Sequence, residues 1–191
     1  MAIDPLLELL ASQSAPASHL HRLQQLWQHC RDSPSCKAMC LVGSYAKGAG
    51  DRISDLDLAA CTDAGQAAGF LAGAHRLLAS EPLLDDYAAC VESGNGWIRK
   101  YVFLDFSSVE LYVTEIPTRF RLKRPYLPVW DPTGYLQQLV VAGEPPRHEE
   151  FEPYPHGDSG LIWELVDCIK WIKRGRVSLA KDYLRRLTDK L

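Results

Sequence analysis

The chain has 191 residues, of which 47% are hydrophobic and 24% are charged. These values are typical of a globular protein with one large domain, or with one domain and a small appendage, and this length can bury a sizeable core. The net charge of −3 argues against a general nucleic-acid coat protein, because such proteins are usually basic.

The N-terminus and the cysteines predict a cytoplasmic protein without a membrane segment. The first ten residues contain Asp4 and Glu8 and lack the positively charged region of a secretory signal. No apolar run approaches the length of a membrane helix. The six cysteines match no zinc or redox spacing, so we expect reduced and mostly buried thiols, with a metal site at Cys30, Cys36 and Cys40 as the alternative.

Hydrophobic periodicity predicts an alternation of helices and strands along most of the chain. In chain order, the first half is expected to contain a helix over 15–30, a strand over 38–42, a helical turn over 44–47, a strand over 53–61 and a helix over 63–79. The second half is expected to contain strands over 86–93, 97–106 and 109–116, a helix start or turn at the Asp-Pro pair 131–132, and helices over 161–173 and 177–191.

This order of elements predicts an α/β fold of the α+β kind, in which helices flank a mixed sheet and a short helical segment follows. Residues 1–143 form the expected α/β domain. Residues 144–157 are rich in proline, glycine and acidic residues, which is typical of a linker. Residues 158–191 form the C-terminal helical segment.

Two carboxylates stand close together in the second predicted strand. Side chains alternate along a strand, so Asp55 and Asp57 project to one face while Leu56 and Leu58 project to the other. Two carboxylates this close repel each other unless a proton or a cation neutralises them. Hard cations such as Mg²⁺ prefer oxygen ligands and often bind one or two carboxylates together with substrate phosphates. The pair therefore predicts a metal site.

A Gly-Ser pair precedes the carboxylates by ten residues. Gly43 allows the backbone to approach a ligand closely, and Ser44 with the following N–H groups can donate to a phosphate at a helix start. A metal beside a phosphate-binding turn is the arrangement that phosphoryl or nucleotidyl transfer requires.

Gly43-Ser44 followed by Asp55-Leu56-Asp57 resembles the signature of the DNA polymerase β-like nucleotidyltransferase superfamily. The stretch "GSYAKGAGDRISDLDL" is especially similar to the small bacterial branch, which includes aminoglycoside and lincosamide adenylyltransferases that confer antibiotic resistance. The resemblance is strongest over residues 38–61. It implies a nucleotidyltransferase fold for residues 1–143.

The resemblance also implies a third carboxylate on a neighbouring strand. Glu110, in "SVELYV", and Asp105, in "VFLDFS", are the candidates. We favour Glu110 because it lies inside a strand, whereas Asp105 stands where a turn-forming carboxylate is common. The family more often has aspartate here, so Glu110 is expected to bind metal, to act as general base, or to do both.

The resemblance implies an in-line attack by an acceptor hydroxyl on the α-phosphorus of a nucleoside triphosphate, with pyrophosphate as the leaving group. Asp55, Asp57 and Glu110 would hold a two-metal Mg²⁺ site, or Mn²⁺ in its place. Gly43 and Ser44, and the loop residues Lys47 and Arg52, are the expected nucleotide contacts, although each loop cation could equally be a solvated charge.

A basic row follows the last predicted strand of the sheet. It lines the path of an acidic ligand, or it is the solvated face of an edge strand, where positive charge prevents aggregation. The row consists of Arg119, Arg121, Lys123 and Arg124.

The expected function is transfer of a nucleoside monophosphate, with ATP as the donor, to a hydroxyl of a small molecule such as an aminoglycoside or lincosamide. Two alternatives remain open. One is a minimal nucleotidyltransferase antitoxin that modifies a partner protein, although members of that group usually lack a segment like 158–191. The other is a nucleotide-binding module without catalysis, against which the intact Gly-Ser and aspartate pairs argue.

Overall fold

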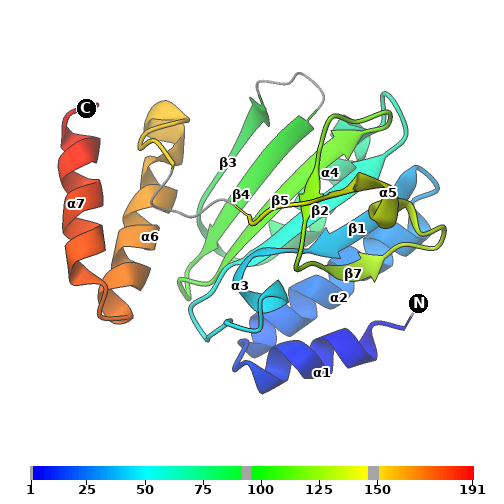
Figure 1. Cartoon of the computed structure of the whole chain (residues 1–191), viewed down its shortest axis with the longest axis horizontal. Helices are drawn as coiled ribbons and strands as arrows, with labels where there is room; N and C mark the ends of the chain where they lie inside the picture. Colours follow the sequence, from blue (N-terminus) through cyan, green and yellow to red (C-terminus); the bar gives the residue numbers. More distant parts are fainter. Residues whose placement is uncertain (1, 92–95, 146–150) are drawn as a thin grey trace. The chain divides into compact units, whose positions relative to one another are not determined.

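A computed structural model gives the structure of residues 2–91, 96–145 and 151–191. The chain folds as two compact units, Met1–Glu144 and Pro145–Leu191. The first unit contains a six-stranded mixed sheet with helices, and the second unit is helical (Figure 1). The predicted class, a mixed α/β fold followed by C-terminal helices, is therefore confirmed.

The main sheet combines one parallel pair with antiparallel neighbours. Its strands are, in spatial order, β3 (Leu83–Val91), β4 (Gly96–Phe103), β5 (Ser108–Glu115), β2 (Leu56–Thr62), β1 (Cys36–Leu41) and β7 (Leu127–Trp130). Only β2 and β5 run parallel among these neighbours, so the chain crosses over between them through a helix and two further strands. A small parallel sheet pairs β6 (Leu122–Lys123) with β8 (Val140–Val141).

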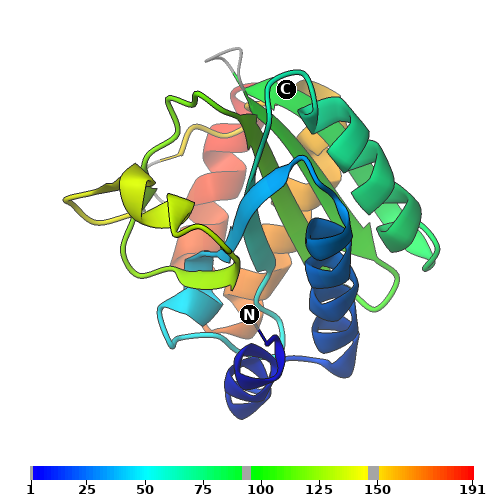
Figure 2. The same ribbon diagram turned by 90° about the vertical axis from the view of Figure 1, so that its right-hand side faces the viewer.

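Helices cover one face of the main sheet. Both α2 (Ala17–Asp32) and α4 (Ala67–Leu78) contact the strands, and α1 (Asp4–Ser12) packs on α2. Figure 2 shows α2 and α4 on one side of the sheet and the short α5 (Tyr135–Leu139) on the other. The apolar stripe of each helix faces the strands because its residues recur every three or four positions.

The two faces of β2 belong to different apolar clusters. The helix-side core takes Leu56, Leu58 and Ala60. The opposite face, which we call the site face, contains a smaller cluster made of Ala38, Cys40, Ala59, Cys61, Leu122, Leu136 and Leu139. By strand alternation Asp57 projects from the site face, as the sequence predicts.

Several predicted boundaries are wrong at the ends of elements. The predicted strand over 53–61 begins only at Leu56, and the predicted helix over 63–79 begins at Ala67 because Gly65 adopts a left-handed φ of 73° in the preceding turn. The helix α1 and the strand β7 were not predicted. The end of the predicted strand over 86–93 lies outside the described residues.

A buried arginine ties α2 to the far end of the sheet. The guanidinium of Arg22 donates to both carboxylate oxygens of Glu81, at 3.1 and 2.7 Å, and to Ser107 Oγ at 2.6 Å. It also lies 3.3 Å from the centre of the Phe103 ring. These contacts satisfy a buried charge and hold the turn between β4 and β5, from which β5 begins.

The C-terminal unit is a helical hairpin. Its helices are α6 (Leu161–Lys173), preceded by a 3₁₀ turn over Gly157–Gly160, and α7 (Val177–Thr188). Trp171 packs edge-on against Tyr183 with ring centres 5.2 Å apart, and the Tyr183 hydroxyl donates to Glu164 at 2.8 Å.

Residues 146–150 of the predicted linker lie outside the described residues. No described helix combines the length and the apolar composition that crossing a bilayer requires.

Candidate active site

Gly43 lets the two halves of the sequence motif meet. It follows β1 and has a φ of 68°, in the left-handed region that favours glycine. A Cβ atom at this position would lie 1.8 Å from Asp57 Oδ2, a distance that no side chain tolerates. The Asp57 carboxylate therefore packs directly against the Gly43 backbone, next to Ser44 in the single-turn helix α3 (Gly43–Ala46).

The loop between the motif halves is held by its own polar groups. Asp51 Oδ1 accepts from the Ile53 N–H and from the Ser54 hydroxyl, each at 3.0 Å, while Ser54 Oγ accepts from the Asp51 N–H at 3.0 Å. The Tyr45 hydroxyl donates to the Asp51 carbonyl at 2.7 Å. Ser54 therefore orders the turn before β2 together with Asp51, and this turn leads to Asp55 just before the strand.

Three carboxylates lie near the start of β2 and β5. Asp57 and Glu110 are opposite residues of the parallel pair β2 and β5, so their side chains leave the sheet on the same side. Asp55 lies two residues before Asp57 and accepts a hydrogen bond from the Ser108 hydroxyl. Ser108 begins β5 two residues before Glu110, so the row Asp55–Ser108 lies beside the row Asp57–Glu110.

Lys100 extends this row across β4 and was missed by the sequence reasoning. It stands opposite Glu110 in the antiparallel pair β4 and β5, and its ammonium lies 2.7 Å from Glu110 Oε2. The signal was present in the sequence, because Lys100 alternates with the apolar Ile98 and Val102 on the same strand face. A lysine between two apolar residues on one strand face is expected to pair with an acidic residue on a neighbouring strand.

Asp105 occupies a turn rather than the row of carboxylates. It accepts hydrogen bonds from the backbone and the hydroxyl of Ser107 and, at 3.2 Å, from the Ser18 hydroxyl. Burial raises the pKa of Asp105, but the Ser107 and Ser18 hydrogen bonds and the Arg22 charge together lower it below its ordinary value. These contacts are those of a turn-forming carboxylate.

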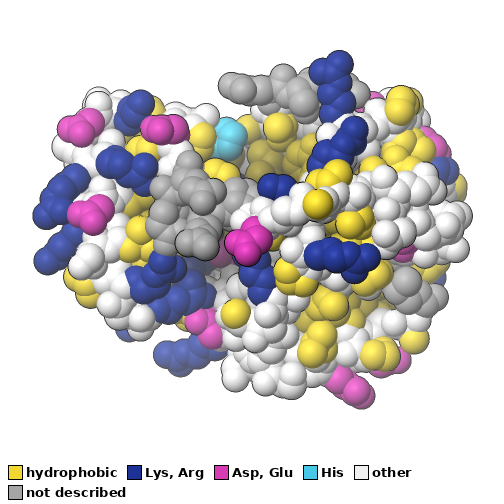
Figure 3. Space-filling model, in the orientation of Figure 1, with side chains coloured by type: hydrophobic (Ala, Val, Ile, Leu, Met, Phe, Trp, Pro, Cys, Tyr) yellow, Lys and Arg dark blue, Asp and Glu magenta, His cyan; other side chains and the backbone are white. Residues whose placement is uncertain are grey.

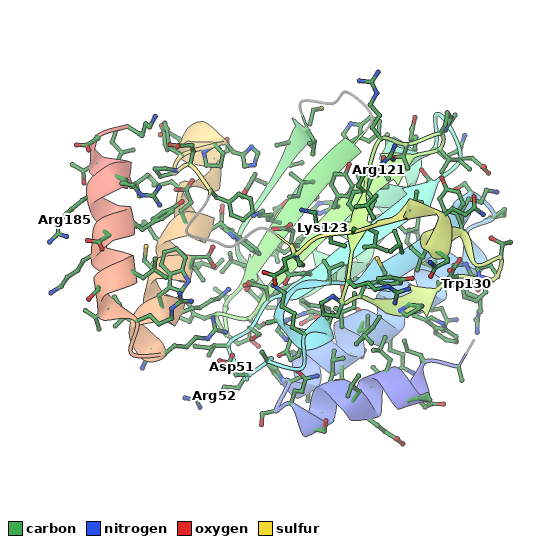
Figure 4. All side chains as sticks on the ribbon, viewed as in Figure 1. Asp51, Arg52, Arg121, Lys123, Trp130 and Arg185 are labelled. Carbon is green, nitrogen blue, oxygen red and sulfur yellow. The ribbon has the colours of Figure 1, made fainter. Side chains whose placement is uncertain are left out.

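The two loop cations lie at the surface. Lys47 and Arg52 are exposed, and within the described parts of the chain neither forms an ion pair or a hydrogen bond through its side chain. Figure 4 shows Arg52 extending away from the sheet beside Asp51. Both cations can therefore reorient at small cost towards an anionic ligand.

The basic row lies on a segment anchored over the site face. Leu122 is buried in the site-face cluster, and Phe120 packs on Tyr112 with ring centres 5.1 Å apart. Figure 3 shows Lys and Arg side chains among apolar ones on this unit, and Arg121 and Lys123 are labelled in Figure 4. The Arg121 guanidinium donates to the carbonyl oxygens of Thr118 and Phe120, and the Arg124 guanidinium donates to Gln137 Oε1.

The donor set fits a hard divalent cation only in part. Asp55 and Asp57 supply carboxylate oxygens, which Mg²⁺ prefers, and the glycine at position 43 leaves room for the Asp57 carboxylate. Within the described residues, however, no three His, Cys, Asp or Glu side chains are arranged to hold an ion. The predicted third ligand, Glu110, instead pairs with Lys100. Cys30, Cys36 and Cys40 likewise form no such group among the described residues.

A neutral histidine is buried in α2 next to these groups. His19 is fully buried, packs edge-on towards Tyr45 at 6.1 Å, and makes no hydrogen bond of normal geometry with any described residue. Burial and then the Arg22 charge lower the pKa of His19 from 6.5 to about 4, more than Asp55 and Asp105 raise it. The folded protein therefore holds this imidazole uncharged at neutral pH.

His19 predicts a loss of stability in mild acid. Because its folded pKa lies below the unfolded value, the unfolded chain takes up the proton first. The protonation of His19 therefore leaves the free energy of unfolding unchanged above pH 6.5 and lowers it by about 3 kcal/mol in total as the pH falls towards about 4. Urea unfolding at several pH values should show this decrease in the free energy of unfolding in the wild type but not in His19→Gln. The variant of the exposed His21, His21→Gln, should show the same decrease as the wild type. A full decrease in His19→Gln would contradict the prediction.

Comparisons with known proteins leave the chain without a family. No family model and no curated protein sequence matches it. Among solved structures it is similar to a CCA-adding enzyme in apo form, with a TM-score of 0.39 and 14% identity over 58% of this chain. The chain spans only 24% of the length of that protein. A likeness this distant does not assign the chain to a family or to an activity.

Proposed function

We propose that the chain is a metal-dependent nucleotidyltransferase that transfers a nucleoside monophosphate, AMP from ATP, to a hydroxyl of a small-molecule acceptor. One observation carries the proposal. Asp57 lies against Gly43, opposite Glu110, and one strand pleat from Asp55. A buried strand has no structural need for carboxylates in this arrangement, because like charges side by side are destabilising unless a cation joins them.

The residues divide the work by position. Asp55 and Asp57, together with Glu110, would hold Mg²⁺ or Mn²⁺, and the ion would supply positive charge beside the triphosphate and its α-phosphoryl group. Ser44 donates to a phosphate oxygen beside Gly43. Lys47 and Arg52 turn from solvent to the outer phosphates.

Glu110 takes the proton of the acceptor hydroxyl. The hydroxyl oxygen then forms a bond to the α-phosphorus while the bond from that phosphorus to its bridging oxygen breaks. Pyrophosphate leaves with the electron pair of that bond. The acceptor is thus left as a phosphodiester of the nucleoside monophosphate.

An acceptor screen tests the proposal. The full chain is incubated with each nucleoside triphosphate, Mg²⁺ or Mn²⁺, and a panel of hydroxylated small molecules that includes aminoglycosides and lincosamides. We expect pyrophosphate release that depends on both metal and acceptor, and an acceptor heavier by one nucleoside monophosphate in mass spectrometry. Transfer to a protein hydroxyl would favour the antitoxin alternative, and nucleotide binding without turnover in the presence of every acceptor would favour the silent binding module.

A further inference from the structure

We propose that Lys100 is a built-in counter-ion that competes with a divalent cation for Glu110 and thereby sets the metal affinity of the site. The inference rests on the proposed function, since it concerns the same carboxylates. It makes Lys100 a positioning residue, which acts on the metal and the acceptor through Glu110.

The position of Lys100 is determined by the sheet. Its strand neighbour across β4 and β5 is Glu110, and Glu110 has Asp57 as its neighbour across β5 and β2. The Lys100 side chain is only 15% exposed, and its ammonium lies 2.7 Å from Glu110 Oε2. A lysine that is held this firmly has little conformational entropy left to lose, so its pair with Glu110 is stronger than a mobile surface pair.

The formal charge of the row supports this role. Asp55, Asp57 and Glu110 contribute three negative charges and Lys100 one positive charge, which leaves a net charge of −2. Without Lys100 the same face would hold a charge of −3 and would attract a cation more strongly, since the sites lie within a few ångströms of one another.

Glu110 can bind a cation or accept a proton from the acceptor only after Lys100 releases it. In the present structure its carboxylate is occupied by Lys100, which agrees with the lack of a ready-made group of three ligands among the described residues. A divalent cation bound to Glu110 would displace the Lys100 ammonium, which would stay on the same strand face. The phosphates of a bound nucleotide are the anions that can then accept it, so nucleotide binding and metal binding should favour each other.

Metal titration of the full chain tests the proposal without relying on activity. Mn²⁺ is added to the wild type and to Lys100→Met, and the dissociation constant is measured by calorimetry. We expect Lys100→Met to bind Mn²⁺ at least about tenfold more tightly, because a neighbouring positive charge has been removed. Lys100→Arg, which keeps the charge, should bind like the wild type. If Lys100→Met does not fold, Lys100→Gln replaces it, since glutamine can still donate to Glu110.

Lys37→Met is the matched control. Lys37 also forms an ion pair, with Asp63 at 2.6 Å, but it lies at the opposite end of β1 from Gly43. Its removal should leave the Mn²⁺ affinity unchanged. A tightening in Lys37→Met equal to that in Lys100→Met would overturn the proposal, because net charge alone would then explain it.

The outcomes separate this inference from the proposed function. Equal Mn²⁺ affinity in the wild type and Lys100→Met, with binding lost in Asp57→Asn, would overturn the role of Lys100 and leave the metal site standing. No difference between the wild type and Asp57→Asn would overturn the metal site itself and the inference with it.

Discussion

The Asp57→Asn variant is expected to lose at least about a thousandfold in the rate of nucleotidyl transfer while it keeps its fold. The metal charge that Asp57 would hold is worth several kcal/mol of transition-state stabilisation, and each ~1.4 kcal/mol is tenfold in rate. Asparagine has nearly the same shape, so its side chain still fits against Gly43. Steady-state pyrophosphate release with the identified acceptor measures the loss.

The stability of Asp57→Asn should rise or stay unchanged, although its activity falls. Removing one charge from a row of carboxylates relieves repulsion, so thermal unfolding should occur at the same or a higher temperature than in the wild type. Asp105→Asn is the matched control, because its carboxylate serves the turn at Ser107. That variant should keep its activity and unfold more easily. Full activity in Asp57→Asn, or a comparable loss of activity in Asp105→Asn, would contradict the assignment of the site.

The Gly43→Ala variant should lose both activity and stability. The Cβ of an alanine at this position would lie 1.8 Å from Asp57 Oδ2, so the carboxylate would have to move aside. A displacement of about 1 Å at a reacting group can cost a hundredfold in rate, so we expect at least that loss. Alanine at a left-handed φ costs a further ~1 kcal/mol of stability.

Gly48→Ala separates the two causes. Gly48 has nearly the same φ, 70°, but an added Cβ there would meet nothing within 4 Å. It should lose only about 1 kcal/mol in the free energy of unfolding and keep its rate. Urea unfolding and steady-state kinetics on both variants give the comparison. If Gly43→Ala and Gly48→Ala lose the same stability and the same rate, the close approach of Asp57 to Gly43 does not contribute to activity.

Local sequence patterns predicted most of the fold. The helices over residues 15–30 and 161–173 and the strands that contain Asp57 and Glu110 follow from apolar periods of 3.6 and 2, which one stretch of chain displays by itself. The boundaries were less accurate. Asp51 and Ser54 bind one another and delay the start of β2, and a glycine at position 65 delays the start of α4. These are contacts within turns that periodicity does not register.

The candidate site divides in the same way. From the sequence alone, Asp57 was predicted to project opposite Leu56 and Leu58, with Asp55 and a Gly-Ser turn ahead of it, because spacing along one strand decides which side chains lie on one face. Only the tertiary structure decided that Asp57 lies opposite Glu110 and that Glu110 is bound by Lys100. Those pairs join residues far apart in the chain. Their register depends on how three strands align in the folded sheet, and no local pattern encodes that alignment.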